Sequence, residues 1–197
     1  MAESTSNMSD ADSGTANSDD AAVRHLISGV ELPDVTLLSH RGEGVNLATR
    51  RGAAVVYVYP WTGRPGVSDP PGWDDIPGAH GSTPETEGFR DHYLKFRSQK
   101  IEVFGVSTQS DEHQQELAAR LAVPFQLLSD EMFAFQRALA LPTFQAGNEL
   151  YLRRLTLFIR DGIIAHTFHP VERPGEHARE ILDWLDEKRR VLNSGQI

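Results

Sequence analysis

One short segment of the chain constrains its fold more than any other. Residues 53–59 read Ala-Ala-Val-Val-Tyr-Val-Tyr, without a polar side chain ionised at neutral pH, and Pro60 follows directly. An apolar run that does not alternate with polar residues is typical of a central strand covered on both faces. The segment therefore predicts an α/β architecture in which helices cover both sides of a sheet.

The rest of the sequence supplies strands and helices to surround this one. Asp161-Gly162 separates two apolar runs and predicts a tight hairpin. Before the central run, we expect an N-terminal hairpin from 35–38 and 45–47. After it, we expect strands at 101–106, 125–128, 155–159 and 163–168, and helices from about 83, at 111–121, at 132–139 and at 177–192. The order ββ-β-α-β-α-β-α-ββ-α predicts one mixed central sheet with helices on both faces.

A long loop precedes the first predicted helix. Residues 62–81 contain nine glycines and prolines: Gly63, Pro65, Gly66, Pro70, Pro71, Gly72, Pro77, Gly78 and Gly81. A loop of this length inside a compact domain is uncommon and often functional. Ser82-Thr-Pro-Glu85 resembles a capping box with proline in the first turn, which predicts that Ser82 is the N-cap of the helix.

Composition excludes several classes of function. The chain has no cysteine, so disulfides, thiolate metal sites and catalytic thiols are excluded. Its net charge is −9, and residues 1–20 contribute −5, which leaves −4 for the remainder. This balance gives no electrostatic footprint for nucleic acid. No apolar run reaches the ~18 residues of a membrane helix, and no secretory signal is recognisable, so we expect neither a nucleic-acid nor a membrane partner and a cytoplasmic location.

The sequence predicts one domain with two irregular ends. Residues 1–22 are rich in Ser, Asp, Ala and Asn without an apolar period, which predicts a disordered tail. We expect the folded domain at 23–192 and a flexible C-terminus at 193–197.

Five segments, in order, give the chain a family resemblance. They are Val55-Val-Tyr-Val-Tyr-Pro60, Ser82-Thr-Pro-Glu-Thr-Glu-Gly-Phe-Arg-Asp91, Phe104-Gly-Val-Ser107, Val123-Pro-Phe-Gln-Leu-Leu-Ser-Asp130 and Arg154-Leu-Thr-Leu-Phe-Ile159. Together they resemble the peroxiredoxin family (AhpC/TSA, redoxin), in particular its peroxiredoxin Q, or bacterioferritin-comigratory, branch. The resemblance covers residues 28–187 and implies a thioredoxin-like fold in its peroxiredoxin elaboration.

The resemblance also implies a chemistry that this chain lacks. The family reduces hydroperoxides with a cysteine thiolate at a helix N-terminus, which a second thiol then resolves. Here the peroxidatic position is Ser82 and the resolving position is Glu87, while Arg154 matches the catalytic arginine. Pro60 matches the start of the family's P-x-x-x-T-x-x-C motif. The place of its threonine holds Ala79, and we expect Thr62, displaced by the inserted loop, as a substitute.

Three explanations of Ser82 remain open at this stage. The serine is an introduced replacement for cysteine in a one-cysteine peroxidase, or the natural protein has lost catalysis and keeps the pocket for binding or regulation, or the pocket has been repurposed for non-redox chemistry on a small molecule. In each case we expect a small-molecule or peroxide-like ligand, no cofactor and a possible homodimer. The predicted pocket consists of Pro60, Thr62, Ser82, Glu87 and Arg154, with the Trp61–Trp73 loop as its wall.

Each of these residues also has a purely structural interpretation. Ser82 as a nucleophile needs a base, for which His80 and His92 are the local candidates. Glu87 equally stabilises the helix dipole, and Arg154 equally forms an ion pair with Glu87 or Glu85. Trp61 and Trp73 equally anchor the loop.

A segment rich in histidine near the C-terminus is a weak candidate for a metal site. His166, His169, Glu172 and His177 lie close in sequence. The spacing of the first two directs them to opposite faces of a strand, so we expect surface histidines and no metal there.

Overall fold

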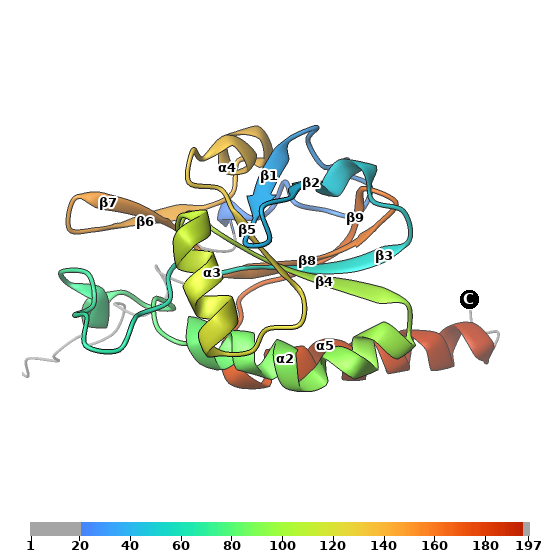
Figure 1. The fold of residues 1–197 in the computed structure, drawn as a ribbon. Coiled ribbons are helices and arrows are strands. Elements are labelled where there is room, and N and C mark those ends of the chain that lie inside the picture. The colour runs from blue at the N-terminus through green and yellow to red at the C-terminus, as the bar shows by residue number, and fades with distance from the viewer. Residues whose placement is uncertain (1–20, 195–197) are drawn as a thin grey trace, which may run out of the picture.

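A seven-stranded mixed sheet forms the centre of the molecule (Figure 1). This computed structural model describes residues 21–194. The sheet order is β2-β1-β5-β4-β3-β8-β9. The strands are β1 (Thr36–Ser39), β2 (Gly44–Asn46), β3 (Ala53–Val58), β4 (Ile101–Ser107), β5 (Gln126–Ser129), β8 (Leu155–Arg160) and β9 (Ile163–Phe168).

The predicted central strand is β3, which lies between two long neighbours. It runs parallel to β4 and antiparallel to β8, so that Val55 pairs with Val103 on one side and with Phe158 on the other. Val55 and Tyr57 belong to the core on one face of the sheet, whereas Val56 and Val58 belong to the core on the other. All four side chains are fully buried, because both faces of the strand are covered. This explains why apolar and polar residues do not alternate along the segment.

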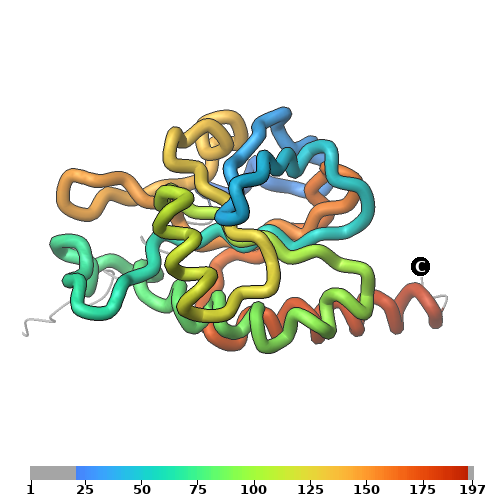
Figure 2. Tube along the Cα trace, in the orientation of Figure 1, coloured from blue at the N-terminus to red at the C-terminus, as the bar shows by residue number. Residues whose placement is uncertain are grey.

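Helices cover both faces, as expected. The helices α2 (Ser82–Ser98), α3 (Asp111–Arg120) and α5 (Pro174–Asn193) share one core, while α4 (Ala134–Leu139) and the short 3₁₀ helix η1 (Leu47–Thr49) contribute to the other. Figure 2 shows α2 and α5 side by side along the lower face of the sheet. Their backbones approach closely at Gly88, where a Cβ atom would stand 2.8 Å from the carbonyl oxygen of Gly175. The second turn of α2 is thus packed directly against the start of α5.

The structure contains a second, two-stranded sheet that the sequence did not predict. The strands β6 (Thr143–Ala146) and β7 (Glu149–Leu152) form a hairpin around Gly147, which has a φ of 58°. The hairpin projects from the main sheet on the same side as the long loop, which carries the 3₁₀ helix η2 (Trp73–Asp75) (Figure 1). Loop and hairpin meet in a small core of their own, made of Trp73, Ala79, Phe144, Ala146 and Tyr151.

The two predicted irregular ends lie almost entirely outside the described residues. The predicted tail at 1–22 lies outside them except for its last two residues, and so does most of the segment at 193–197; α5 itself continues to Asn193. Within residues 21–194, no helix is both long and apolar enough to cross a membrane.

Candidate active site around Ser82

Ser82 is the first residue of α2, and its side chain does not cap the helix. Gly81 occupies the N-cap with a φ of 104°, and no side chain there accepts a hydrogen bond from the helix. A Cβ atom at Gly81 would lie 2.7 Å from Pro174 of α5, so that glycine is required both by its conformation and by packing. The predicted N-cap was therefore wrong by one residue. The Ser82 hydroxyl is free for another partner, although the residue is only 2% exposed.

That partner is Arg154, which lies between β7 and β8. Its Nη2 donates to Ser82 Oγ at 3.1 Å and to the carbonyl oxygen of His80 at 3.0 Å. Its Nη1 donates to Glu85 Oε2 in a very short ion pair. Arg154 is buried, so one guanidinium joins the end of the long loop, the first residue of α2 and a carboxylate one turn further along the helix.

Glu85 is the buried acid of the site, and Glu87 is not. Glu85 is fully buried; burial raises the pKa of its carboxyl to about 7, while the Arg154 guanidinium opposes that rise. Glu87 is half-buried, and its carboxylate lies 3.9 Å from Arg90 on the outer side of the helix. Of the two partners considered for Arg154, the structure brings Glu85 to it.

A hydrogen-bonded chain links Ser82 to the central strand. Thr86 Oγ1 donates to the carbonyl oxygen of Ser82 at 3.0 Å and accepts from the Tyr57 hydroxyl at 3.2 Å. Burial raises the pKa of Tyr57 well above its usual value, so its hydroxyl stays a donor. This chain holds the first turn of α2 near the end of β3. Pro60, two residues beyond that strand, is buried.

Thr62 lies in a different network from Ser82. Its backbone N–H and its hydroxyl both donate to Gln109 Oε1, at 2.9 Å and 3.0 Å. His113 Nε2 lies 3.3 Å from the same hydroxyl, and no described atom of Ser82 bonds to it. Ala79, where the resemblance predicts the family's threonine, is buried in the small core beside Trp73. No motif in the sequence indicated Gln109 or His113 as partners of Thr62.

A cavity of about 280 Å³ lies in front of Ser82. Trp61 and Trp73 both line it, with ring centroids 5.5 Å apart in an edge-to-face arrangement. Trp73 is buried against Tyr151 and Phe144 of the hairpin, at centroid distances of 4.9 Å and 5.5 Å. The indole of Trp73 therefore both anchors the loop and forms a wall of the cavity.

Comparison with known proteins decides the family. The model of the Redoxin family matches residues 27–183. The chain belongs to the redoxin family. It is similar to the chloroplastic peroxiredoxin Q of Sedum lineare, with 30% identity over 161 residues, 81% of this chain and 78% of that protein. It is 28% identical to the chloroplastic peroxiredoxin Q of Oryza sativa subsp. japonica over 158 residues, 80% of this chain and 65% of that protein.

Solved redoxin-family structures share the fold. A peroxiredoxin Q mutant from Xanthomonas campestris, with serine in place of a cysteine, superimposes with a TM-score of 0.65 at 24% identity, covering 82% of this chain and 98% of that one. Peroxidoxin BcpB from Mycobacterium tuberculosis superimposes with a TM-score of 0.66 at 21% identity, covering 82% and 97%. The fold is thioredoxin-like in its peroxiredoxin elaboration, as the sequence predicted. Since this redoxin-family chain has no cysteine, it lacks the sulfur for thiol peroxidase chemistry.

The histidines of this redoxin-family chain do not activate Ser82. Within residues 21–194, neither His80 nor His92 bonds to Ser82 Oγ: His80 pairs with Asp74 at 2.8 Å, and His92 bonds to the carbonyl oxygen of Gly88 at 3.0 Å. Among residues 21–194, the geometry therefore provides no base within hydrogen-bond reach of the Ser82 hydroxyl.

The four residues weighed as a metal site do not form one. His166 stacks on Trp184 at 4.7 Å, and His177 bonds to Thr156 Oγ1 at 2.9 Å. His177 is 3% exposed, so the expectation of a surface histidine was wrong at that position. Within the described part of the chain, the one group of His and acidic side chains that could hold a metal ion is Asp69, Asp74 and His80, which the sequence analysis did not single out.

Proposed function

We propose that this redoxin-family protein does not reduce peroxides and instead binds a small polar molecule in the cavity in front of Ser82. The observation that carries the proposal is the Ser82 hydroxyl, which accepts a hydrogen bond from a buried arginine and has no base beside it. A serine hydroxyl is not appreciably ionised near neutral pH and has no sulfenic acid state, so it supports binding and not electron transfer.

Ser82 is not the only difference from the family's pattern. The position expected for its threonine also differs, which favours a changed pocket over the loss of the cysteine sulfur alone. If sulfur alone were missing, a threonine hydroxyl should still face residue 82. Instead Ala79 occupies that place, and Thr62 bonds to Gln109. The loop that carries these differences also supplies the aromatic wall of the cavity. These features support repurposing over a simple replacement of cysteine by serine.

Binding is better supported than non-redox catalysis at Ser82. A nucleophilic serine needs a general base within hydrogen-bond reach. The carboxyl group one turn away, Glu85, is already paired with Arg154. What remains is a set of polar groups suited to hold a ligand: Ser82 Oγ, Asp69 and the imidazole of His80 around an aromatic wall.

Restoring sulfur tests this proposal. Peroxide consumption with dithiothreitol as reductant should not exceed background for the unaltered protein. Ser82→Cys should react no faster than an ordinary protein thiol, because the threonine hydroxyl is missing. Ser82→Cys combined with Ala79→Thr should react faster than Ser82→Cys alone. Fast turnover by Ser82→Cys alone would contradict the proposal and identify a peroxidase that lacks only its sulfur.

Ligand binding is tested separately with small probes. Acetate, glycerol and inorganic phosphate are titrated while tryptophan fluorescence is recorded, because Trp61 and Trp73 line the cavity. Trp61→Phe should reduce the signal without unfolding the protein. If no small polar probe perturbs the fluorescence, the binding role is wrong.

We also propose that the protein forms a homodimer and that it is located in the cytoplasm. Light scattering of the purified chain tests the first, and microscopy of a fluorescent fusion tests the second.

A further inference from the structure

We propose that Asp69, Asp74 and His80 form a binding site for one divalent transition-metal ion of the Zn²⁺ type, at the mouth of the cavity in front of Ser82. The inference shares Asp69 and His80 with the proposed binding cavity. It does not require that a small polar molecule binds there, because it is argued from the three loop side chains alone.

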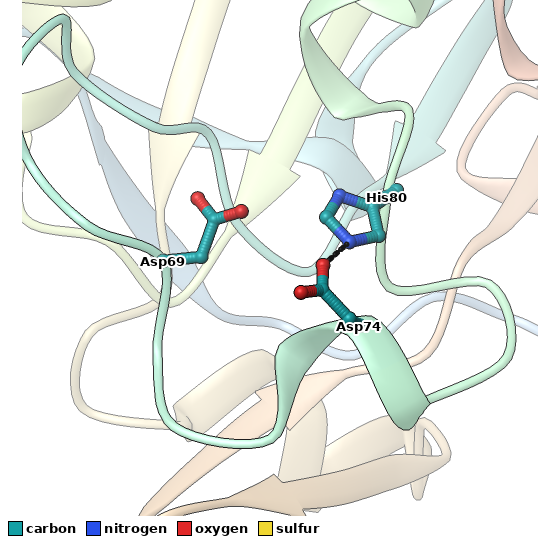
Figure 3. A group of neighbouring side chains, drawn as sticks. All are labelled: Asp69, Asp74 and His80. Carbon is teal, nitrogen blue, oxygen red and sulfur yellow. Dashed lines mark hydrogen bonds and ion pairs between the residues drawn. The ribbon is translucent and has the colours of Figure 1, made fainter.

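The first argument is the placement of the donor atoms. One carboxylate oxygen from each aspartate and one ring nitrogen of His80 all lie within 4.8 Å of one another. Figure 3 shows the three side chains converging from separate parts of the loop: Asp69 from its outgoing arm, Asp74 from η2 and His80 from the segment before α2. Donors about 2.0–2.2 Å from a zinc ion are roughly 3–4 Å apart, so small side-chain rotations complete the site.

The second argument is charge. Two carboxylates lie beside each other, yet among residues 21–194 no lysine or arginine forms an ion pair with either of them. The only cation-forming partner is the imidazole of His80, whose Nε2 lies 2.8 Å from Asp74 Oδ1. The arginine of the same loop, Arg64, faces Glu116 at 3.5 Å instead. A bound dication would supply the positive charge that the local side chains do not.

The third argument is the rigidity of the loop. The buried Trp73 precedes Asp74 directly and is held by the hairpin, while the carbonyl oxygen of His80 accepts a hydrogen bond from Arg154. Ligands held on a fixed backbone lose less conformational freedom when a metal binds.

The ligand types indicate which ion fits. Imidazole nitrogen suits zinc, copper, iron and nickel, whereas Mg²⁺ and Ca²⁺ take oxygen ligands almost alone. Three protein ligands leave at least one coordination position for water or a ligand, as in open zinc sites. Asp69 and His80 also line the cavity at Ser82, which places the proposed ion beside that cavity.

Calorimetric titration tests the site. The full chain, freed of any affinity tag and of metal by a chelator, is titrated with ZnCl₂ and, in parallel, with MgCl₂. We expect one equivalent of Zn²⁺ to bind and Mg²⁺ to give no saturable signal. His80→Gln and Asp74→Asn should each weaken Zn²⁺ binding by about tenfold or more.

Asp75→Asn is the matched control, because Asp75 is exposed on the same 3₁₀ helix but is not part of the group. It should leave Zn²⁺ affinity unchanged, and circular dichroism confirms that all variants are folded. Absence of saturable Zn²⁺ binding would overturn the proposal. So would binding that His80→Gln and Asp74→Asn both leave intact, because the ion would then lie elsewhere in the chain.

Discussion

Arg154 and Thr62, two of the polar residues expected beside Ser82, have different hydrogen-bond partners in the structure. Arg154 is buried and reaches Ser82 Oγ at 3.1 Å, whereas Thr62 is equally buried but bonds to Gln109. Arg154 directly precedes β8, a strand of the main sheet. Thr62 lies at the start of a long loop. The residue beside the sheet bonds to Ser82, whereas the residue at the start of the loop bonds to Gln109.

The difference has an energetic reason. Arg154 is tied to a buried carboxylate, and removing one partner of such a pair leaves an uncompensated charge in the interior. This cost opposes loss of the arginine whatever reaction the pocket performs. A threonine hydroxyl on a loop needs only one hydrogen-bond acceptor, which Gln109 supplies. Retention of Arg154 is therefore weak evidence for retained catalysis.

The largest effect we predict tests this account. Arg154→Met should lower the free energy of unfolding by about 3 kcal/mol, because Glu85 is left buried without its partner. Urea unfolding measures the loss. Arg179→Ala, which breaks an exposed ion pair with Glu176, is the control and should cost less than about 0.5 kcal/mol.

The pH dependence of that loss separates charge from packing. Burial already raises the pKa of Glu85, and removal of Arg154 raises it further. Below that pKa the lone carboxyl is protonated and neutral, and above it the carboxylate is charged and unpaired. The cost of Arg154→Met should therefore be larger at pH 8 than at pH 6. An equal loss at both values would assign the role of Arg154 to packing.

The next prediction concerns His177, a buried polar group on α5 near Arg154. Burial lowers its pKa to about 4; Glu180 opposes the shift and Arg154 adds to it. Between pH 6.5 and 4 the unfolded chain binds a proton that the folded chain does not, so the stability that the neutral imidazole contributes above pH 6.5 is lost as the pH falls.

A variant isolates this contribution. His177→Gln keeps a hydrogen-bonding side chain opposite Thr156 but does not titrate. Relative to this variant, the unaltered protein should lose on the order of 2 kcal/mol of stability between pH 7 and pH 4, measured by urea unfolding at each pH. Parallel pH profiles for the two proteins would show that His177 is protonated to the same extent in both states.

The sequence was a good guide to features fixed by the sheet and a poor guide to the loop. Continuous apolarity at 53–59 and the Asp161-Gly162 turn depend on neighbours in sequence, and both elements were predicted. The hairpin around Gly147 was missed, although its Gly-Asn turn was a usable signal.

The hydrogen-bond partners within the site could not be predicted from neighbouring residues in the sequence. The capture of Thr62 by Gln109 joins residues 47 positions apart, and the approach of Asp69 to His80 depends on how Trp73 packs. Glu85 and Glu87 are both acids in the first turns of α2. Only the packing of α2 against its neighbours determines which of them is buried.

The smallest effect we predict bears on Thr62. Thr62→Val keeps the shape of the side chain but removes the hydroxyl bonded to Gln109, and should cost about 1 kcal/mol in urea unfolding. In a Ser82→Cys background the same change should leave the rate of peroxide consumption unaltered, because Thr62 does not face residue 82. Gln109→Leu combined with Thr62→Val should cost less than the sum of the two single changes, since both remove one interaction. A marked fall in the peroxide rate with Thr62→Val would place this threonine back in the pocket and end the contrast with Arg154.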